Sequence, residues 1–147
     1  MAVNIVMGPP CSGKSTFIKN TFPDATVIDL FDFQKNKPFA TVESVMESYI
    51  EAKDALVAVL KENKKVVLEH TLLRAIRREI YVNAIKEVTD EPINIYVLIP
   101  EKATFVEFSK RRKCPTDDRY IADLFGTLEI PTQNEGFDNV YVIMPRI

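Results

Sequence analysis

Residues 7–16 read MGPPCSGKST, and from Gly8 to Ser15 they carry the pattern G-x-x-x-x-G-K-[ST]. Average residue usage makes this pattern a chance event in fewer than about one chain in a hundred of this length. The apolar run at 2–7 is typical of a buried strand, and the segment after the pattern is typical of a helix. A phosphate-binding loop requires this context. The stretch therefore predicts a loop that binds a nucleoside triphosphate.

The residue types of this loop explain how it would hold phosphate. Gly8 and Gly13 permit unusual backbone angles and close approach, so consecutive N–H groups can point at phosphate oxygens. Lys14 would bridge the β- and γ-phosphates as a catalytic cation, and the Ser15 hydroxyl would bind Mg²⁺. We expect ATP and Mg²⁺ as cofactors, with nucleotide contacts from the whole loop: Gly8, Pro9, Pro10, Cys11, Ser12, Gly13, Lys14, Ser15 and Thr16.

Strand and helix patterns alternate along the rest of the chain. The predicted strands are 2–7, 25–31, 64–70, 93–100 and 139–144. The predicted helices are 14–22, 41–63, 74–88, 102–113 and 117–128, with loops at 33–38 and 129–138. Solidly apolar strands between helices favour a parallel sheet covered on both faces. We predict one α/β domain over residues 1–147, a three-layer sandwich with a parallel five-stranded sheet and a helical lid.

The composition is that of an ordinary globular chain, with 46% hydrophobic and 27% charged residues and a net charge of −2. This charge argues against nucleic-acid binding through bulk positive charge, so a local basic patch would be needed. No apolar run approaches the roughly 18 residues of a membrane span, and no signal peptide precedes the first strand. We expect a cytoplasmic protein with no membrane partner.

The two cysteines, Cys11 and Cys114, are too few for a disulfide framework. We expect them to be free thiols and incidental small residues in a reducing compartment. A lid folded over the phosphate loop could bring the two near each other, but we do not expect this.

Phosphate loops occur in molecular switches, motors and kinases. The chain contains no N-K-x-D motif of the kind that GTPases use to recognise guanine. ATP-driven motors of the AAA type need a longer chain with sensor regions. A compact kinase agrees best with 147 residues.

Three acids follow predicted strands, where ligands collect in open α/β sheets. Asp29 and Asp32 follow the second strand, and either carboxylate could orient the acceptor hydroxyl and take its proton. Asp32 is preferred by a small margin because the chain leaves the sheet there. Glu69 ends the third strand, in the position of an acid that holds Mg²⁺ or its waters. His70 is expected to be structural, with at most a minor role on the substrate side.

Two groups of cations are candidates for binding anions. Arg74, Arg77 and Arg78 share one face of a predicted helix and are either a solvated surface or a patch that binds an anionic acceptor. Arg111 and Arg112 lie at the end of the helix 102–113, where cations also suit the helix dipole. One of these two arginines is expected to close over the phosphates as part of the lid and stabilise charge in the transition state.

With these motifs, the chain resembles the polynucleotide kinase branch of the small P-loop kinases. The likeness covers GPPCSGKST, VIDLFDF after the second strand, VVLEHTLLRAIRR at the third, FVEFSKRRK in the lid and IPTQNEGFDNVYVI near the end. The resemblance implies transfer of the γ-phosphate of ATP to a hydroxyl, most typically the 5′-hydroxyl of a nucleic acid. It also implies an aspartate base at Asp32 or Asp29, the lid arginine at Arg112 and a contact between Phe137 and the adenine base.

Three hypotheses remain open from the sequence. The first is a kinase of a nucleic-acid or nucleotide hydroxyl, and the second is a small-metabolite kinase on the same fold. The third is a nucleotide-binding module that acts through a protein partner.

Overall fold

A five-stranded sheet forms the centre of the computed structural model, which describes residues 1–35, 37, 41–114 and 116–145. The strand order is β2-β3-β1-β4-β5, and every neighbouring pair is parallel. The register pairs Met7 with His70 and Asp29 with Glu69, so the carboxyl ends of β1, β2 and β3 meet at one edge of the sheet. The strands are β1 Val3–Met7, β2 Thr26–Asp29, β3 Val66–His70, β4 Ile93–Leu98 and β5 Asn139–Ile143.

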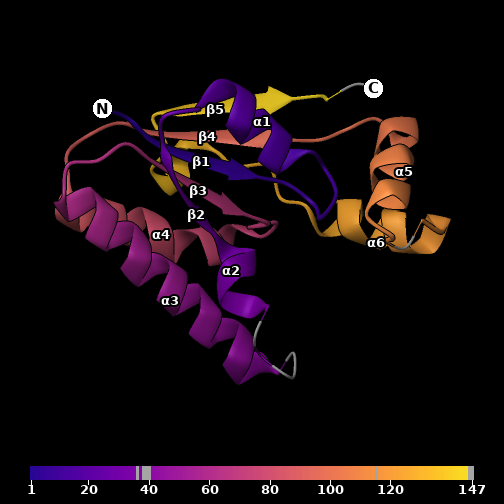
Figure 1. The fold of residues 1–147 in the computed structure, drawn as a ribbon, viewed down its shortest axis with the longest axis horizontal. Helices are drawn as coiled ribbons and strands as arrows, with labels where there is room; N and C mark the ends of the chain where they lie inside the picture. The colour runs from indigo at the N-terminus through magenta and orange to yellow at the C-terminus, as the bar shows by residue number, and fades with distance from the viewer. Residues whose placement is uncertain (36, 38–40, 115, 146–147) are drawn as a thin grey trace.

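The helices complete the predicted three-layer arrangement, which the structure confirms (Figure 1). Helix α1, Lys14–Thr21, lies on one face of the sheet, and α3, Val42–Lys61, and α4, Ala75–Val88, lie on the other. Helices α5, Lys102–Arg111, and α6, Asp118–Thr127, stand beyond the carboxyl ends of the strands as a lid. The short elements are α2, Leu30–Gln34, and η1, Gln133–Glu135.

The second strand is shorter than the sequence predicts. It ends at Asp29, whose carboxylate accepts a hydrogen bond of 3.0 Å from the backbone N–H of Phe31 and so caps α2. The predicted strand over 25–31 is therefore wrong at residues 30 and 31, and the predicted loop over 33–38 is wrong at residues 33 and 34, which belong to α2. Residues 36 and 38 of that loop lie outside the described part. The other predicted elements occur with ends shifted by up to two residues.

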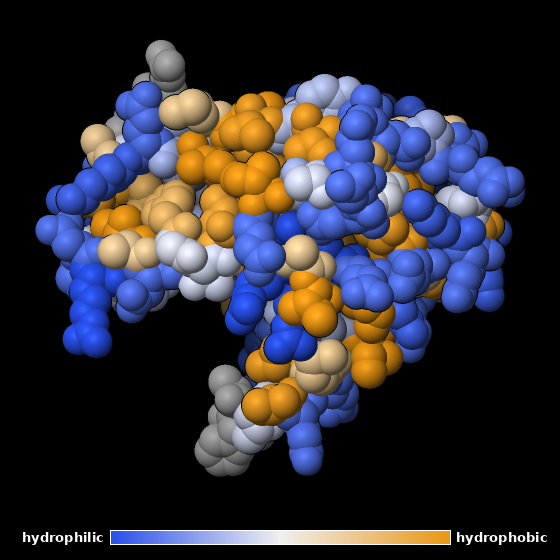
Figure 2. All heavy atoms as spheres, turned by 180° about the vertical axis from the view of Figure 1, so that it is seen from behind, coloured by the Kyte–Doolittle hydropathy of each residue, from blue (hydrophilic) through white to orange (hydrophobic). Residues whose placement is uncertain are grey.

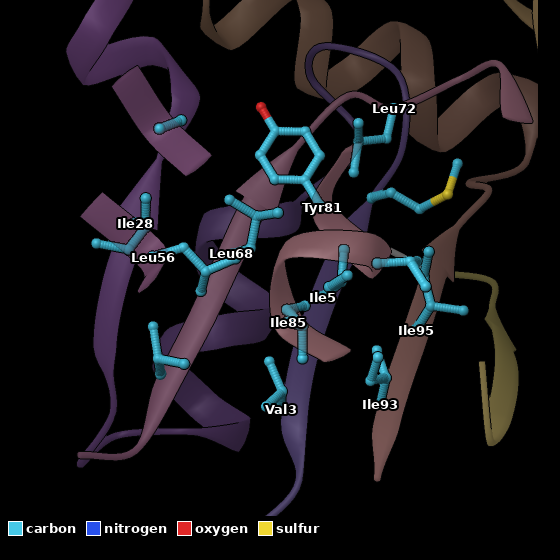
Figure 3. Close-up of a cluster of buried hydrophobic side chains, with 14 of the residues drawn as sticks. Val3, Ile5, Ile28, Leu56, Leu68, Leu72, Tyr81, Ile85, Ile93 and Ile95 are labelled. Carbon is cyan, nitrogen blue, oxygen red and sulfur yellow. The ribbon is translucent and has the colours of Figure 1, made fainter. Parts of the chain in front are cut away.

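The main hydrophobic core lies between the sheet and the layer of α3 and α4 (Figure 3). Strand residues such as Ile5, Leu68 and Ile95 point into it, and Leu56 from α3 and Ile85 from α4 pack against them. Their apolar patterns follow directly from the strand and helix periods. None of the helices within the described ranges has the length and apolarity of a membrane span.

Phe137 belongs to this core, with an exposed fraction of 2%. The preceding Gly136 adopts a φ of +111°, and a Cβ there would come within 2.8 Å of Val82 on α4. The turn thus directs Phe137 into the core. Phe137 comes just before the first residue of β5, at the amino end of that strand, whereas the phosphate loop follows the carboxyl end of β1. The expected contact between Phe137 and the nucleotide base is wrong for this reason.

Candidate active site

The phosphate loop connects β1 to α1 in a conformation that its residues make possible. Gly13 has a φ of +91° and lies against the ring of Phe108 from the lid, where a Cβ would approach to 3.2 Å. Gly8 packs so closely on β4 that a Cβ would come within 2.7 Å of the Leu98 carbonyl oxygen. Cys11 also adopts a positive φ, of 66°. The loop therefore depends on its glycines for both backbone angle and close packing.

Lys14 lies at the N-terminus of α1 with its side chain folded along the loop. Its ammonium group donates hydrogen bonds to the carbonyl oxygens of Gly8, at 3.0 Å, and Pro9, at 2.9 Å. Burial lowers the pKa of Lys14 to about 8, and the nearby Glu69 partly opposes this shift. A buried, still cationic ammonium group beside the loop agrees with the predicted role of Lys14 as a ligand of phosphate.

Ser15 and Glu69 lie together, as the magnesium prediction requires. The Ser15 hydroxyl lies 3.0 Å from each carboxylate oxygen of Glu69 and donates to them. The pKa of Glu69 is raised to about 7, mainly by burial and next by the negative charge of Asp29. The hydrogen bond from Ser15 lowers this pKa, but by less than Asp29 raises it. These oxygen atoms suit Mg²⁺, which binds one or two carboxylates and completes its shell with phosphate oxygens and water. The described residues contain no cluster of three or more His, Cys, Asp or Glu side chains suited to a metal.

The two candidate bases lie in different surroundings. Asp29 lines the same cavity as Lys14 and Glu69, and its carboxylate influences the pKa values of both. Asp32 lies one turn into α2 with an exposed side chain and forms an ion pair with Lys35 at 3.4 Å. Asp32 is not among the residues that line this cavity. The geometry therefore favours Asp29 over Asp32 at the reacting groups.

His70 is a buried structural residue, with an exposed fraction of 1%. Its Nδ1 accepts from the Leu72 backbone N–H at 3.2 Å, so Nε2 carries the proton and donates to the Tyr81 hydroxyl at 3.0 Å. The Tyr81 hydroxyl in turn donates to the Tyr49 carbonyl oxygen. Burial lowers the pKa of His70 to about 3, so its imidazole is neutral at physiological pH. These hydrogen bonds fix the end of β3. Because His70 also lines the cavity that contains Lys14, its minor role on the substrate side stays a prediction.

The three arginines near the start of α4 do not form the single basic face that their spacing suggests. Arg78 is fully buried, in an ion pair with Glu135 at 2.7 Å and a hydrogen bond to the Leu72 carbonyl oxygen. It therefore cannot bind a substrate anion, and it joins α4 to η1 instead. Arg74 is exposed and paired with Glu129, and Arg77 lies 5.9 Å from the centre of the Tyr49 ring. This corrects the expected arginine patch.

The lid places its two arginines differently. Arg112 lines the cavity that contains Lys14, and its charge is close enough to lower the pKa of Lys14. Arg111 pairs with Glu107 at 3.3 Å and lines only the neighbouring cavity. The arrangement agrees with Arg112 as the lid arginine near the phosphates.

Two adjoining cavities share residues of the phosphate loop and the lid. The first, of about 440 Å³, contains the loop, Asp29, Glu69 and Arg112. The second, of about 510 Å³, lies between α1 and α5 and is lined mainly by Thr16, Phe17, Asn20, Phe108, Ile143 and Pro145. Seen from behind, the molecule is notched between the lid and the end of α2 and α3 (Figure 2). Cavities of this size are typical of small-molecule sites.

Sequence reasoning missed several residues that line the first cavity. They are Phe31, which is 64% exposed, Gln34 and Thr71. Thr71 follows Glu69 and His70 directly, so its position at the end of β3 was a usable signal. Phe31 and Gln34 gave none, because they fell in the predicted strand and loop that the structure replaces with α2.

Cys11 and Cys114 are joined by a disulfide, so the expectation of two free and unrelated thiols is wrong. The residues are 103 positions apart in the chain. The lid packs over the phosphate loop through Phe105, Phe108 and Ile121, and this packing brings the sulfur atoms together.

Comparison with known proteins identifies the fold. No family model matches the sequence, and no curated protein matches it. A sugar kinase from Janibacter sp. HTCC2649 superposes with a TM-score of 0.72 at 13% identity, over 98% of this chain and 85% of its own. A gluconokinase from Sinorhizobium meliloti 1021 has a TM-score of 0.62 at 15% identity, over 97% of this chain and 82% of its own. A chain of the Pnkp1/Rnl/Hen1 RNA repair complex has a TM-score of 0.72 at 18% identity, over 93% of this chain and 46% of its own. The chain therefore has the fold of the P-loop kinases.

Proposed function

We propose that the chain is an ATP-dependent kinase that transfers the γ-phosphoryl group to a hydroxyl. The observation that carries this proposal is the convergence of Lys14, Ser15, Glu69 and Asp29 on one cavity, with the phosphate loop on one side and an open rim on the other. A donor site and an acceptor carboxylate are the two parts that phosphoryl transfer to a hydroxyl requires.

The donor half would position and neutralise the triphosphate. The loop N–H groups and the Lys14 ammonium would bind the β- and γ-phosphates, and Arg112 would stabilise charge from the lid side. Ser15 and Glu69 would hold Mg²⁺, which when bound neutralises charge on the phosphate oxygens. The base of ATP would occupy the adjoining cavity, where Phe17, Phe108 and Ile143 offer apolar contacts.

Asp29 is proposed as the base of the acceptor half. Its carboxylate would accept a hydrogen bond from the acceptor hydroxyl, orient it toward the γ-phosphate and take its proton as the O–P bond forms. Asp32 is less suited to this role, because its side chain is exposed and paired with Lys35 and does not line the cavity.

The proposed acceptor is the 5′-hydroxyl of a nucleotide or of the end of a nucleic-acid strand. Support comes from the exposed ring of Phe31 at the rim beside Asp29, which offers a surface for stacking a base. Since Arg78 is buried and Arg74 is paired, a long basic track for a polymer is not part of the proposal. A small-metabolite acceptor is the alternative.

The test is label transfer from γ-labelled ATP to a panel of 5′-hydroxyl DNA, 5′-hydroxyl RNA, nucleosides, nucleotides and small hydroxyl metabolites. Label on oligonucleotides or nucleosides supports the proposal, and loss of that label in a Phe31→Ala variant supports stacking at the rim. Label on a metabolite alone would replace the proposed acceptor. Tight ATP binding without transfer to any acceptor would contradict the kinase assignment.

A further inference from the structure

The disulfide between Cys11 and Cys114 joins the phosphate loop to the lid. Cys11 lies in the phosphate loop, and Cys114 lies three residues beyond the end of α5 in the lid. Both residues line the phosphate cavity, and Cys11 also lines the adjoining cavity proposed for the base. The bond therefore lies at the junction of the two cavities.

We infer that Cys11 and Cys114 form a reversible thiol pair, oxidised by a small-molecule disulfide, that locks the lid onto the phosphate loop and slows nucleotide exchange. The effect on exchange rests on the nucleotide binding of the proposed function. In a reducing compartment, such as the cytoplasm expected for this chain, disulfides are rare and usually transient, in catalytic or redox-sensing roles.

The disulfide would restrict the lid because it adds to a connection that the sheet already makes. Strands β1 and β4 are paired from Val3 with Ile93 to Met7 with Val97. The first residues of the phosphate loop and of the lid, which follow these strands, are therefore already held side by side. The disulfide adds a second connection beyond the strand ends and closes a ring through the loop and α5. Lid opening and product release commonly limit turnover in enzymes of this kind, so a covalent closure slows both.

The two cysteines differ in access, which sets the order of the chemistry. Cys114 is half-buried and follows the exposed cations of residues 110–113, whereas Cys11 has an exposed fraction of only 8%. The Cys114 thiolate attacks one sulfur of the small disulfide, forms a mixed disulfide and releases one thiolate. Cys11 then loses its proton, attacks the Cys114 sulfur and releases the second thiolate, so two thiols are oxidised and one disulfide is reduced.

The disulfide lies outside the hydrophobic clusters that pack on the sheet, as expected for a reversible bond rather than one needed for folding. Cys11 belongs to a small cluster with Phe105 and Ile121, distinct from the two clusters that pack on the faces of the sheet. The reduced chain should therefore keep its sheet and its other helices while the lid becomes free to open.

The wild type and the Cys114→Ser variant are each treated with glutathione disulfide, to oxidise the thiols, or with dithiothreitol, to reduce them. Intact mass spectrometry checks that the oxidised wild type has lost two hydrogens, as disulfide formation requires. The chain is loaded with a fluorescent ADP analogue and chased with unlabelled ADP. We expect dissociation about tenfold or more slower in the oxidised wild type, and a Cys114→Ser rate that does not change with treatment. Equal rates in the oxidised and reduced wild type, once the mass confirms the bond, would overturn the lock.

A second readout needs no nucleotide and so separates this inference from the proposed function. Trypsin cleavage at the exposed cations of residues 110–113 should be slower in the oxidised wild type than in the reduced one. The same cleavage should be unaffected by treatment in Cys114→Ser. Equal cleavage in both states of the wild type, or no intramolecular disulfide by mass, would overturn the inference. Protection from trypsin without any ADP binding would support the lock and contradict the proposed function.

Discussion

Replacing Glu69 by Gln should stabilise the metal-free chain in a pH-dependent way. Burial and the Asp29 carboxylate raise the pKa of Glu69 from its ordinary value of 4.5 to about 7. Between these values the folded chain holds a proton that the unfolded chain has released, so the free energy of unfolding falls as pH rises. Its contribution is fully present below the unfolded pKa and is lost as pH rises through the folded pKa. Gln carries no charge in either state, so the variant lacks this loss.

The magnitude follows from the size of the pKa shift. A change from 4.5 to about 7 corresponds to about 3 kcal/mol at about 1.36 kcal/mol per pH unit. Solvent access to the cavity screens the charge, so we expect about 1–2 kcal/mol above pH 7. For a chain of this length, that gain raises the melting temperature by about 3–6 °C. Gln can still accept a hydrogen bond from Ser15, so the comparison changes the charge at residue 69 and keeps this hydrogen bond.

The assay is thermal or urea unfolding with a chelator present, at about pH 5 and about pH 8. The variant should exceed wild type at the higher pH and lose most of that advantage at the lower one. Glu79→Gln on the exposed surface of α4 is the matched control and should show no such pH dependence. Equal stability of wild type and Glu69→Gln at both pH values would refute the reasoning.

Three further variants test other parts of the structure. Lys14→Ala removes the cation proposed for the β- and γ-phosphates, so calorimetry should show ATP affinity about 10- to 100-fold weaker; undiminished binding would contradict the loop assignment. Arg78→Met leaves the Glu135 carboxylate without its buried partner, so urea unfolding should show a loss of about 3 kcal/mol, and a loss below about 1 kcal/mol would make the pair dispensable. Gly13→Ala combines a φ of +91° with a Cβ only 3.2 Å from Phe108, so we expect about 1–3 kcal/mol of destabilisation in the same assay, and an unchanged midpoint would contradict this.

Sequence patterns predicted the fold because its determinants are local. The phosphate-loop motif, the solidly apolar strands and the alternation with helices each follow from residue type and spacing alone. The end of the second strand was missed because a side chain decides it. Asp29 caps α2 through the Phe31 N–H, and this local hydrogen bond outweighs the strand preference of the residues that follow.

The candidate site was predictable where a local pattern decides it, as for Ser15 in the phosphate-loop motif and Glu69 at the end of β3. It was not predictable where long-range packing decides it. Arg78 points inward because Glu135, 57 residues away, offers a carboxylate partner. Cys11 and Cys114 meet because the lid docks on the loop, 103 residues apart in sequence. Helical spacing shows which residues share a face, but not which face meets another part of the chain.

The central proposal is phosphoryl transfer at the cavity that Asp29 shares with Lys14. Its most direct test is single-turnover transfer from γ-labelled ATP by Asp29→Asn, with Asp32→Asn as the matched control one turn along α2. Asn still caps a helix, so α2 should persist. We expect Asp29→Asn to slow transfer about 100-fold or more, as loss of a general base does, with ATP affinity nearly unchanged, and Asp32→Asn to behave as wild type. Transfer that survives in Asp29→Asn and is lost in Asp32→Asn would contradict the account.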